Sequence, residues 1–145
     1  YIGARALWRT DNLRELFVTF SDPEVIGMSA IAGLLEPVSR NDSGGLHVLL
    51  NVPEQAKTAL QVPIAPGLIT TVGVESWQQL EPGIPFTIRQ SSGIIALDGE
   101  RELEFGPEDT VQVTLYEKAF RTVNVVACMR HTGQHRLLVG APLKC

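Results

Sequence analysis

Residues 93–105 read Gly-Ile-Ile-Ala-Leu-Asp-Gly-Glu-Arg-Glu-Leu-Glu-Phe, two short runs typical of strands on either side of Asp98 and Gly99. Both central residues of a type I′ turn need a positive φ, and Asp-Gly adopts that conformation at low cost. This stretch therefore predicts a β-hairpin whose tip is a type I′ turn at Asp98 and Gly99.

The same pattern of short runs and turn residues extends through the chain. The 13 glycines and 9 prolines are spread at intervals, which indicates many short strands joined by turns. A buried helix is predicted at 28–35 and a second helix at 123–135. The other strands are predicted at 16–20, 46–51, 59–64, 69–74, 85–90 and 110–116. We expect a mainly β, sandwich-like fold with one or two short helices, and residues 1–145 as a single domain.

Composition excludes several classes of protein. Of the 145 residues, 44% are hydrophobic and 19% charged, an ordinary balance that argues against disorder. The net charge is −4 with the charges scattered, so no nucleic-acid partner is expected. No apolar run approaches the roughly 18 residues of a spanning helix, so no membrane partner is expected either. Two cysteines, Cys128 and Cys145, suit a cytoplasmic protein, and a start at Tyr1 predicts a piece of a longer one.

The histidines offer one arrangement that resembles a metal site. On a helix, Cys128, His131 and His135 would share one face, as metal ligands sometimes do. A tetrahedral site needs a fourth ligand, and no second Cys/His cluster lies nearby in the sequence. We therefore favour solvated histidines beside a core cysteine and predict no metal. His47, a single histidine within a strand pattern, is predicted to be structural.

The acidic residues of the hairpin follow a strand pattern. Glu100, Glu102 and Glu104 alternate with Leu103 and Phe105, as on a strand with one solvent-facing side. The chain contains no Walker loop, no GxSxG elbow and no HExxH motif. The residues alone therefore predict a β-rich domain without a catalytic set of its own.

Two stretches resemble a known family. The segments 27–38 and 93–102 are similar to the C-terminal domain of the ATP-NAD kinase superfamily, and within it to the branch around the acetoin catabolism protein X. Residues 3–8 and 65–68 also fit that branch, so the resemblance covers most of the chain. It implies a longer protein with an N-terminal α/β domain that carries a Gly-Gly-Asp-Gly motif. Nothing here matches that motif, so we expect that domain to be missing.

The resemblance also implies ligand-binding residues. Gly27, Ser29 and Ala30 fall where NAD kinases carry Gly-Ser-Thr-Ala-Tyr beside the dinucleotide. Met28 and Ile31 replace the serine and the tyrosine of that motif, so a hydroxyl and an aromatic face are lost. A site without those groups should discriminate its ligand differently. Close helix packing through small residues explains Ser29 and Ala30 equally well.

Asp98 is the remaining candidate for ligand binding. Asp98 and Gly99 match the Asp-Gly pair on a hairpin shared by the NAD and lipid kinases of this superfamily. A role as a turn explains the pair without any ligand, and no catalytic residue is assigned.

The resemblance implies an activity for the longer protein: phosphoryl transfer from ATP to a hydroxyl of NAD or a related compound, with Mg²⁺ neutralising the phosphates. The fragment alone should be inactive. Its expected partners are a nucleotide or dinucleotide, the missing N-terminal domain and further copies of itself in a homo-oligomer. One alternative is a non-catalytic ligand-sensing or assembly domain. A lipid or sphingoid kinase is a third possibility, disfavoured by the lack of a membrane-facing segment.

Overall fold

The computed structural model describes residues 12–39, 42–97, 101–117 and 123–140. The elements in chain order are β1 (Glu15–Val18), α1 (Ser29–Leu35), β2 (Gly45–Asn51), β3 (Thr58–Ala65), β4 (Leu68–Leu80), β5 (Phe86–Thr87), β6 (Gly93–Leu97), β7 (Arg101–Phe105), β8 (Gln112–Val113) and α2 (Val125–Gln134). The predicted mainly β class with two short helices is confirmed.

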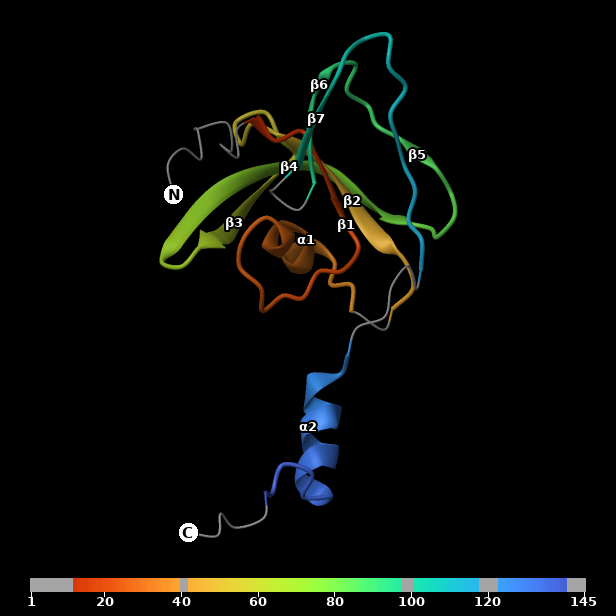
Figure 1. The fold of residues 1–145 in the computed structure, drawn as a ribbon. Helices are drawn as coiled ribbons and strands as arrows, with labels where there is room; N and C mark the ends of the chain where they lie inside the picture. The colour runs from red at the N-terminus through yellow and green to blue at the C-terminus, as the bar shows by residue number, and fades with distance from the viewer. Residues whose placement is uncertain (1–11, 40–41, 98–100, 118–122, 141–145) are drawn as a thin grey trace.

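A four-stranded antiparallel sheet in the order β1-β2-β4-β3 forms the centre of the fold (Figure 1). Leu49 pairs with Ser76 and Leu50 pairs with Val74, so Glu75 is an extra residue in β4. Such a bulge bends a strand and increases its twist, and the long strand β4 is strongly curved in Figure 1.

Helix α1 covers one face of this sheet, here called the first face. Its small residues Ala30, Ala32 and Gly33 are buried, which lets the helix approach its neighbours closely. A Cβ on Gly33 would lie 2.8 Å from the carbonyl oxygen of Asp22, so the chain preceding α1 already touches the helix backbone. The buried core between helix and sheet consists of Ala30, Ile31, Ala32, Val38, Leu46, Val48, Leu50, Val62, Val72 and Val74.

The opposite, second face of the sheet is covered by the residues that follow β4. Alternation along β1 and β2 directs Phe17 and His47 to this face, away from α1. Residues 81–92, here called the strap, carry β5 across it, and β5 pairs with β8. Leu115, just after β8, lies over Gly45 of β2. The second layer therefore consists of the two-stranded β5–β8 ladder. The fold resembles a sandwich only in that this short ladder packs over the four-stranded sheet.

Two details differ from the sequence-based expectations, and a third lies outside the described residues. Leu97 pairs with Arg101, and the type I′ turn predicted at Asp98 and Gly99 falls between them, in residues 98–100, outside the described part of the chain. Leu103 is 55% exposed instead of facing a core, because no described layer covers that side of the hairpin. The strand predicted at 110–116 forms a ladder only at β8, while single backbone hydrogen bonds join Val111 to Ile88 (3.2 Å) and Leu115 to Gly83 (2.8 Å).

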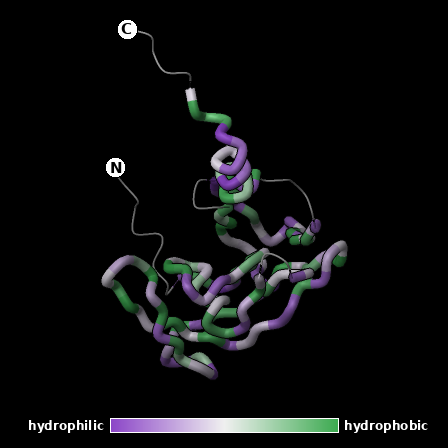
Figure 2. The backbone as a smooth tube through the Cα atoms, turned by 90° about the horizontal axis from the view of Figure 1, so that it is seen from below, coloured by the Kyte–Doolittle hydropathy of each residue, from purple (hydrophilic) through white to green (hydrophobic). Residues whose placement is uncertain are grey.

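Helix α2 lies apart from the sheet in both views (Figures 1 and 2). It begins after Asn124, whose side-chain oxygen accepts a hydrogen bond of 2.9 Å from the backbone N–H of Ala127. None of its residues is buried. The second predicted helix is confirmed, and neither helix among the described residues is long and apolar enough to cross a membrane.

Candidate functional site

Gly27 and Ala30, two of the predicted ligand residues, meet at the start of α1. Gly27 has a φ of +102°, which glycine adopts without strain. Its N–H donates a hydrogen bond of 2.9 Å to the carbonyl of Pro63 on β3, and its own carbonyl accepts one of 3.1 Å from the N–H of Ala30. Gly27 therefore joins the first turn of α1 to the edge of the sheet.

Ser29 is the first residue of α1 and is partly exposed, whereas Ala30 is fully buried in the core. The structure brings Gly27, Ser29 and Ala30 together on one turn, while Asp98 lies outside the described residues. The assignment of these four residues to ligand binding stays a prediction.

The two departures from the family motif both contribute to packing. Ile31 is 0% exposed and belongs to the core cluster, and Met28 packs against the same cluster. Met28 is also the N-cap residue of α1 and makes no side-chain hydrogen bond to the helix. These two positions therefore stabilise the α1–sheet contact instead of presenting a hydroxyl or an aromatic face.

A buried polar cluster on the second face was not predicted from the sequence. The Nε2 atom of His47 lies 2.8 Å from Oε2 of Glu15, and the two side chains are only 2% and 6% exposed. The other carboxylate oxygen of Glu15 accepts hydrogen bonds from the backbone N–H groups of Arg89 (2.7 Å) and Gln90 (3.2 Å) on the strap.

Aromatic rings enclose the imidazole of this cluster. The centroid of the His47 ring lies 4.7 Å from that of Phe17 and 4.3 Å from that of Phe86. Burial lowers the pKa of His47 below its ordinary value of 6.5; the hydrogen bond and charge of Glu15 oppose this effect, and the charge of Arg89 adds to it. At neutral pH His47 is therefore a neutral donor to the Glu15 carboxylate.

The structural role predicted for His47 agrees with its burial, but the sequence did not indicate its partner. Phe17 is the residue directly opposite His47, so Glu15 occupies the diagonal position on the neighbouring strand. The sequence hints at a buried partner only through Glu15 itself, a charged residue at the start of an otherwise apolar strand. The pairing depends on strand register, which one sequence does not reveal.

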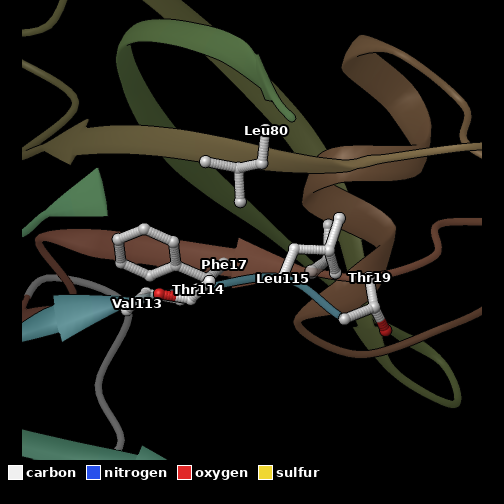
Figure 3. A pocket seen from close by; sticks show the side chains of 7 residues that line it. Phe17, Thr19, Leu80, Val113, Thr114 and Leu115 are labelled. Atoms are coloured by element: carbon white, nitrogen blue, oxygen red, sulfur yellow. The ribbon is translucent and has the colours of Figure 1, made fainter. Parts of the chain in front are cut away.

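Two small pockets lie on the second face. The larger, of about 190 Å³, is lined by residues 17–19, Leu80 and residues 113–115 (Figure 3). The smaller, of about 150 Å³, is lined by residues 78–81 and 84–86. Sites for drug-sized ligands and cofactors measure roughly 300–1,000 Å³. Neither pocket is therefore large enough to enclose a whole nucleotide.

The cysteine and histidines of α2 do not form a three-residue cluster. The rings of His131 and His135 lie 4.2 Å apart by their centroids. Cys128 is an exposed free thiol, so the expectation of a core cysteine was wrong. Within the described ranges no three His, Cys, Asp or Glu side chains come close enough to hold a metal ion.

Comparison with known proteins identifies the family. Residues 1–118 match the family described as the acetoin catabolism protein X C-terminal domain. The chain belongs to this family. It is also similar to Acetoin catabolism protein X of Cupriavidus necator, with 58% identity over 142 residues that cover 98% of this chain and 40% of that protein. The predicted resemblance to the acetoin catabolism protein X branch is thus confirmed.

The match to the acetoin catabolism protein X family has two structural consequences. It ends at residue 118, so it includes the sheet, α1 and the strap but leaves out α2. The chain spans about 40% of the length of that relative, so the relative contains residues that have no counterpart in this chain. No solved structure matches the chain.

Proposed function

We propose that this domain forms one wall of a nucleotide- or dinucleotide-binding site in a longer, kinase-like cytoplasmic protein. The observation that carries the proposal is the family match, combined with a relative of which the chain covers only 40%. Within this wall, Gly27, Ser29 and Ala30 at the start of α1 are proposed to contact the ligand, and Asp98 is proposed as a further contact.

For the longer protein we propose ATP-dependent phosphorylation of NAD or a related hydroxyl compound. Phosphoryl transfer of this kind depends on positioning and on neutralising charge with Mg²⁺. The two pockets on the second face, of about 190 and 150 Å³, are each smaller than a nucleotide site, and no three potential metal ligands cluster among the described residues. We therefore propose that further residues of the longer protein complete the site for ATP, NAD and Mg²⁺.

One observation favours a second candidate, a ligand-sensing or assembly domain without catalysis. Ile31 stands at the position of the family tyrosine and is fully buried, so it has no surface on which a base could stack. A domain can keep a fold while its site changes. In this case the longer protein would bind a ligand without transferring phosphate.

Calorimetric titration tests the proposal. NAD, NADP, ATP and adenosine would be titrated separately into the 145-residue chain and into the longer protein. We expect saturable binding of NAD or NADP to the longer protein and weak or no binding to the chain alone. Ser29→Trp should abolish that binding, whereas Ser43→Trp, an exposed serine before β2, should leave it unchanged. Binding unaffected by Ser29→Trp would exclude the α1 turn, and no binding to the folded longer protein would refute the nucleotide proposal.

We also propose that the domain contacts further copies of itself. Among the described strands, β3 pairs only with β4, so its other edge is free to pair with a further strand except where Gly27 bonds Pro63. Leu68 and Ile69 of the neighbouring β4 are 54% and 67% exposed. Open edges and exposed apolar side chains favour association. Sedimentation equilibrium of wild type and Ile69→Lys tests this: the variant should weaken the oligomer, and a monomeric wild type would refute it.

A further inference from the structure

The carboxylate of Glu15 connects three separate parts of the fold. It lies on β1, contacts Nε2 of His47 on β2 at 2.8 Å, and accepts the backbone N–H groups of Arg89 and Gln90 from the strap at 2.7 and 3.2 Å. Hydrogen bonds to a charged group are roughly twice as strong as neutral ones. With 6% of its side chain exposed, the carboxylate has little access to water as an alternative partner.

Aromatic contacts of Phe86 hold the strap on the sheet at a second point, close to Glu15. Phe86 of β5 lies three residues before Arg89, and its ring contacts His47 at 4.3 Å and Phe17 at 5.5 Å. Most other strap residues are exposed, including all five from 81 to 85. The strap also pairs with residues 111–115, through the β5–β8 ladder and the backbone bonds from Gly83 to Leu115 (2.8 Å) and from Ile88 to Val111 (3.2 Å). It contacts strands β1 and β2 of the sheet around Glu15 and His47.

The strap leads directly into the β6–β7 hairpin. Gln90 is three residues before Gly93, where β6 begins, and in the described part of the chain β6 and β7 pair only with each other. Most residues of the two strands are exposed. Because the sheet ladder does not hold the hairpin, its position depends on the segments at its two ends.

We infer that Glu15 and His47 act as positioning residues, a latch that holds the strap on the sheet and sets the position of the β6–β7 hairpin, and that acid opens this latch. The consequence for ligand binding rests on the proposed function, because Asp98 follows β6 in the sequence. The latch itself requires no ligand.

The acid sensitivity follows from the surroundings of His47. In the described residues the charged groups that act on it are Glu15 from β1 and Arg89 from the strap, while Phe17 and Phe86 are uncharged. Burial and Arg89 disfavour the imidazolium more than Glu15 favours it, so the closed latch prefers neutral His47. In an open latch, water would solvate the ring and restore its ordinary protonation. Because the open state binds a proton more readily, acid favours opening.

Hydrogen exchange tests the latch, because the amides of Arg89 and Gln90 are its own hydrogen-bond donors. Exchange in the 145-residue chain would be measured at about pH 7.5 and about pH 5.5, corrected for intrinsic rates. Glu15→Ala should speed exchange at Arg89, Gln90 and the hairpin about tenfold, the effect of losing hydrogen bonds to a charged group, while the β2–β4 ladder stays protected. Glu36→Ala is the matched control, because the Glu36 carboxylate accepts hydrogen bonds from Trp77 and Gln79 on the first face, the face opposite the strap.

The pH dependence separates a latch from a merely structural contact. Wild-type strap amides should exchange faster at the lower pH, and His47→Gln, which cannot titrate, should remove that difference. If Glu15→Ala does not fold, the wild type and His47→Gln alone decide the question. Strap amides that exchange at the same rate at both pH values, or a pH effect that persists in His47→Gln, would overturn the inference. A chain that binds no nucleotide would leave it intact, since no ligand enters the measurement.

Discussion

Replacing Gly33 with alanine tests the close approach of α1 to the chain before it. A Cβ at this position would lie 2.8 Å from the carbonyl oxygen of Asp22 and 3.0 Å from its carbonyl carbon. Ordinary contacts begin at 3.4 Å, so helix and chain must separate by about 0.6 Å. Neither α1 nor the chain before it can move freely. The helix is buried through Ala30 and Ile31, and the chain is tied by the hydrogen bonds of Ser21.

The expected magnitude follows from two opposing effects. Overpacking a core typically destabilises by about 1–3 kcal/mol, while glycine to alanine within a helix stabilises by about 1 kcal/mol. Because the contact would be with backbone and shorter than 3.0 Å, the overpacking cost should lie in the upper part of that range, about 2–3 kcal/mol. Gly33→Ala should therefore lower the free energy of unfolding by about 1–2 kcal/mol, equivalent to a fall in Tm of roughly 2–8 °C. Urea denaturation followed by circular dichroism measures this change, with the m-value unchanged.

Gly133→Ala in α2 provides the matched control, because nothing lies within 4 Å of the Cβ that it would add. It should raise the helical signal at 222 nm and leave the main unfolding transition within about 0.5 kcal/mol of wild type. A Gly33→Ala protein as stable as wild type, or more stable, would refute the close-contact argument.

Three further outcomes are expected. Burial holds the pKa of His47 below its unfolded value of 6.5, so the unfolded state takes up the proton first as the pH falls. The free energy of unfolding should therefore decrease as the pH drops below about 7. Thermal melts of His47→Gln should show a weaker dependence on pH. Gly44→Ala should destabilise by about 1–3 kcal/mol in urea, since Gly44 has a φ of +108° and its Cβ would lie 2.9 Å from the Leu80 carbonyl. Stoichiometric Zn²⁺ should leave the Tm unchanged, because His131 and His135 lack a third described ligand; a reproducible rise would contradict this.

Local patterns in the sequence predicted most of the individual elements. The small apolar run at 28–35 became α1 at Ser29–Leu35, because its side chains suit burial against a sheet and Pro37 cannot continue the helix. The run at 101–105 became β7 with the same bounds, and the motifs near α1 indicated the family to which the chain belongs. These features depend on neighbours a few residues apart, which a sequence displays directly.

Features that depend on distant residues were decided by the tertiary structure. His47 and Glu15 are 32 positions apart, and Arg89 is a further 42 beyond His47, so their contact arises only once strand register and the path of the strap are set. For the same reason Leu103, which alternates like a half-buried residue, is exposed where no layer covers it. The sequence by itself determined which segments become strands and helices and which family they belong to. Only the tertiary structure decided which faces are covered and which charged groups meet, because a period-two pattern marks a side of a strand without specifying what packs against it.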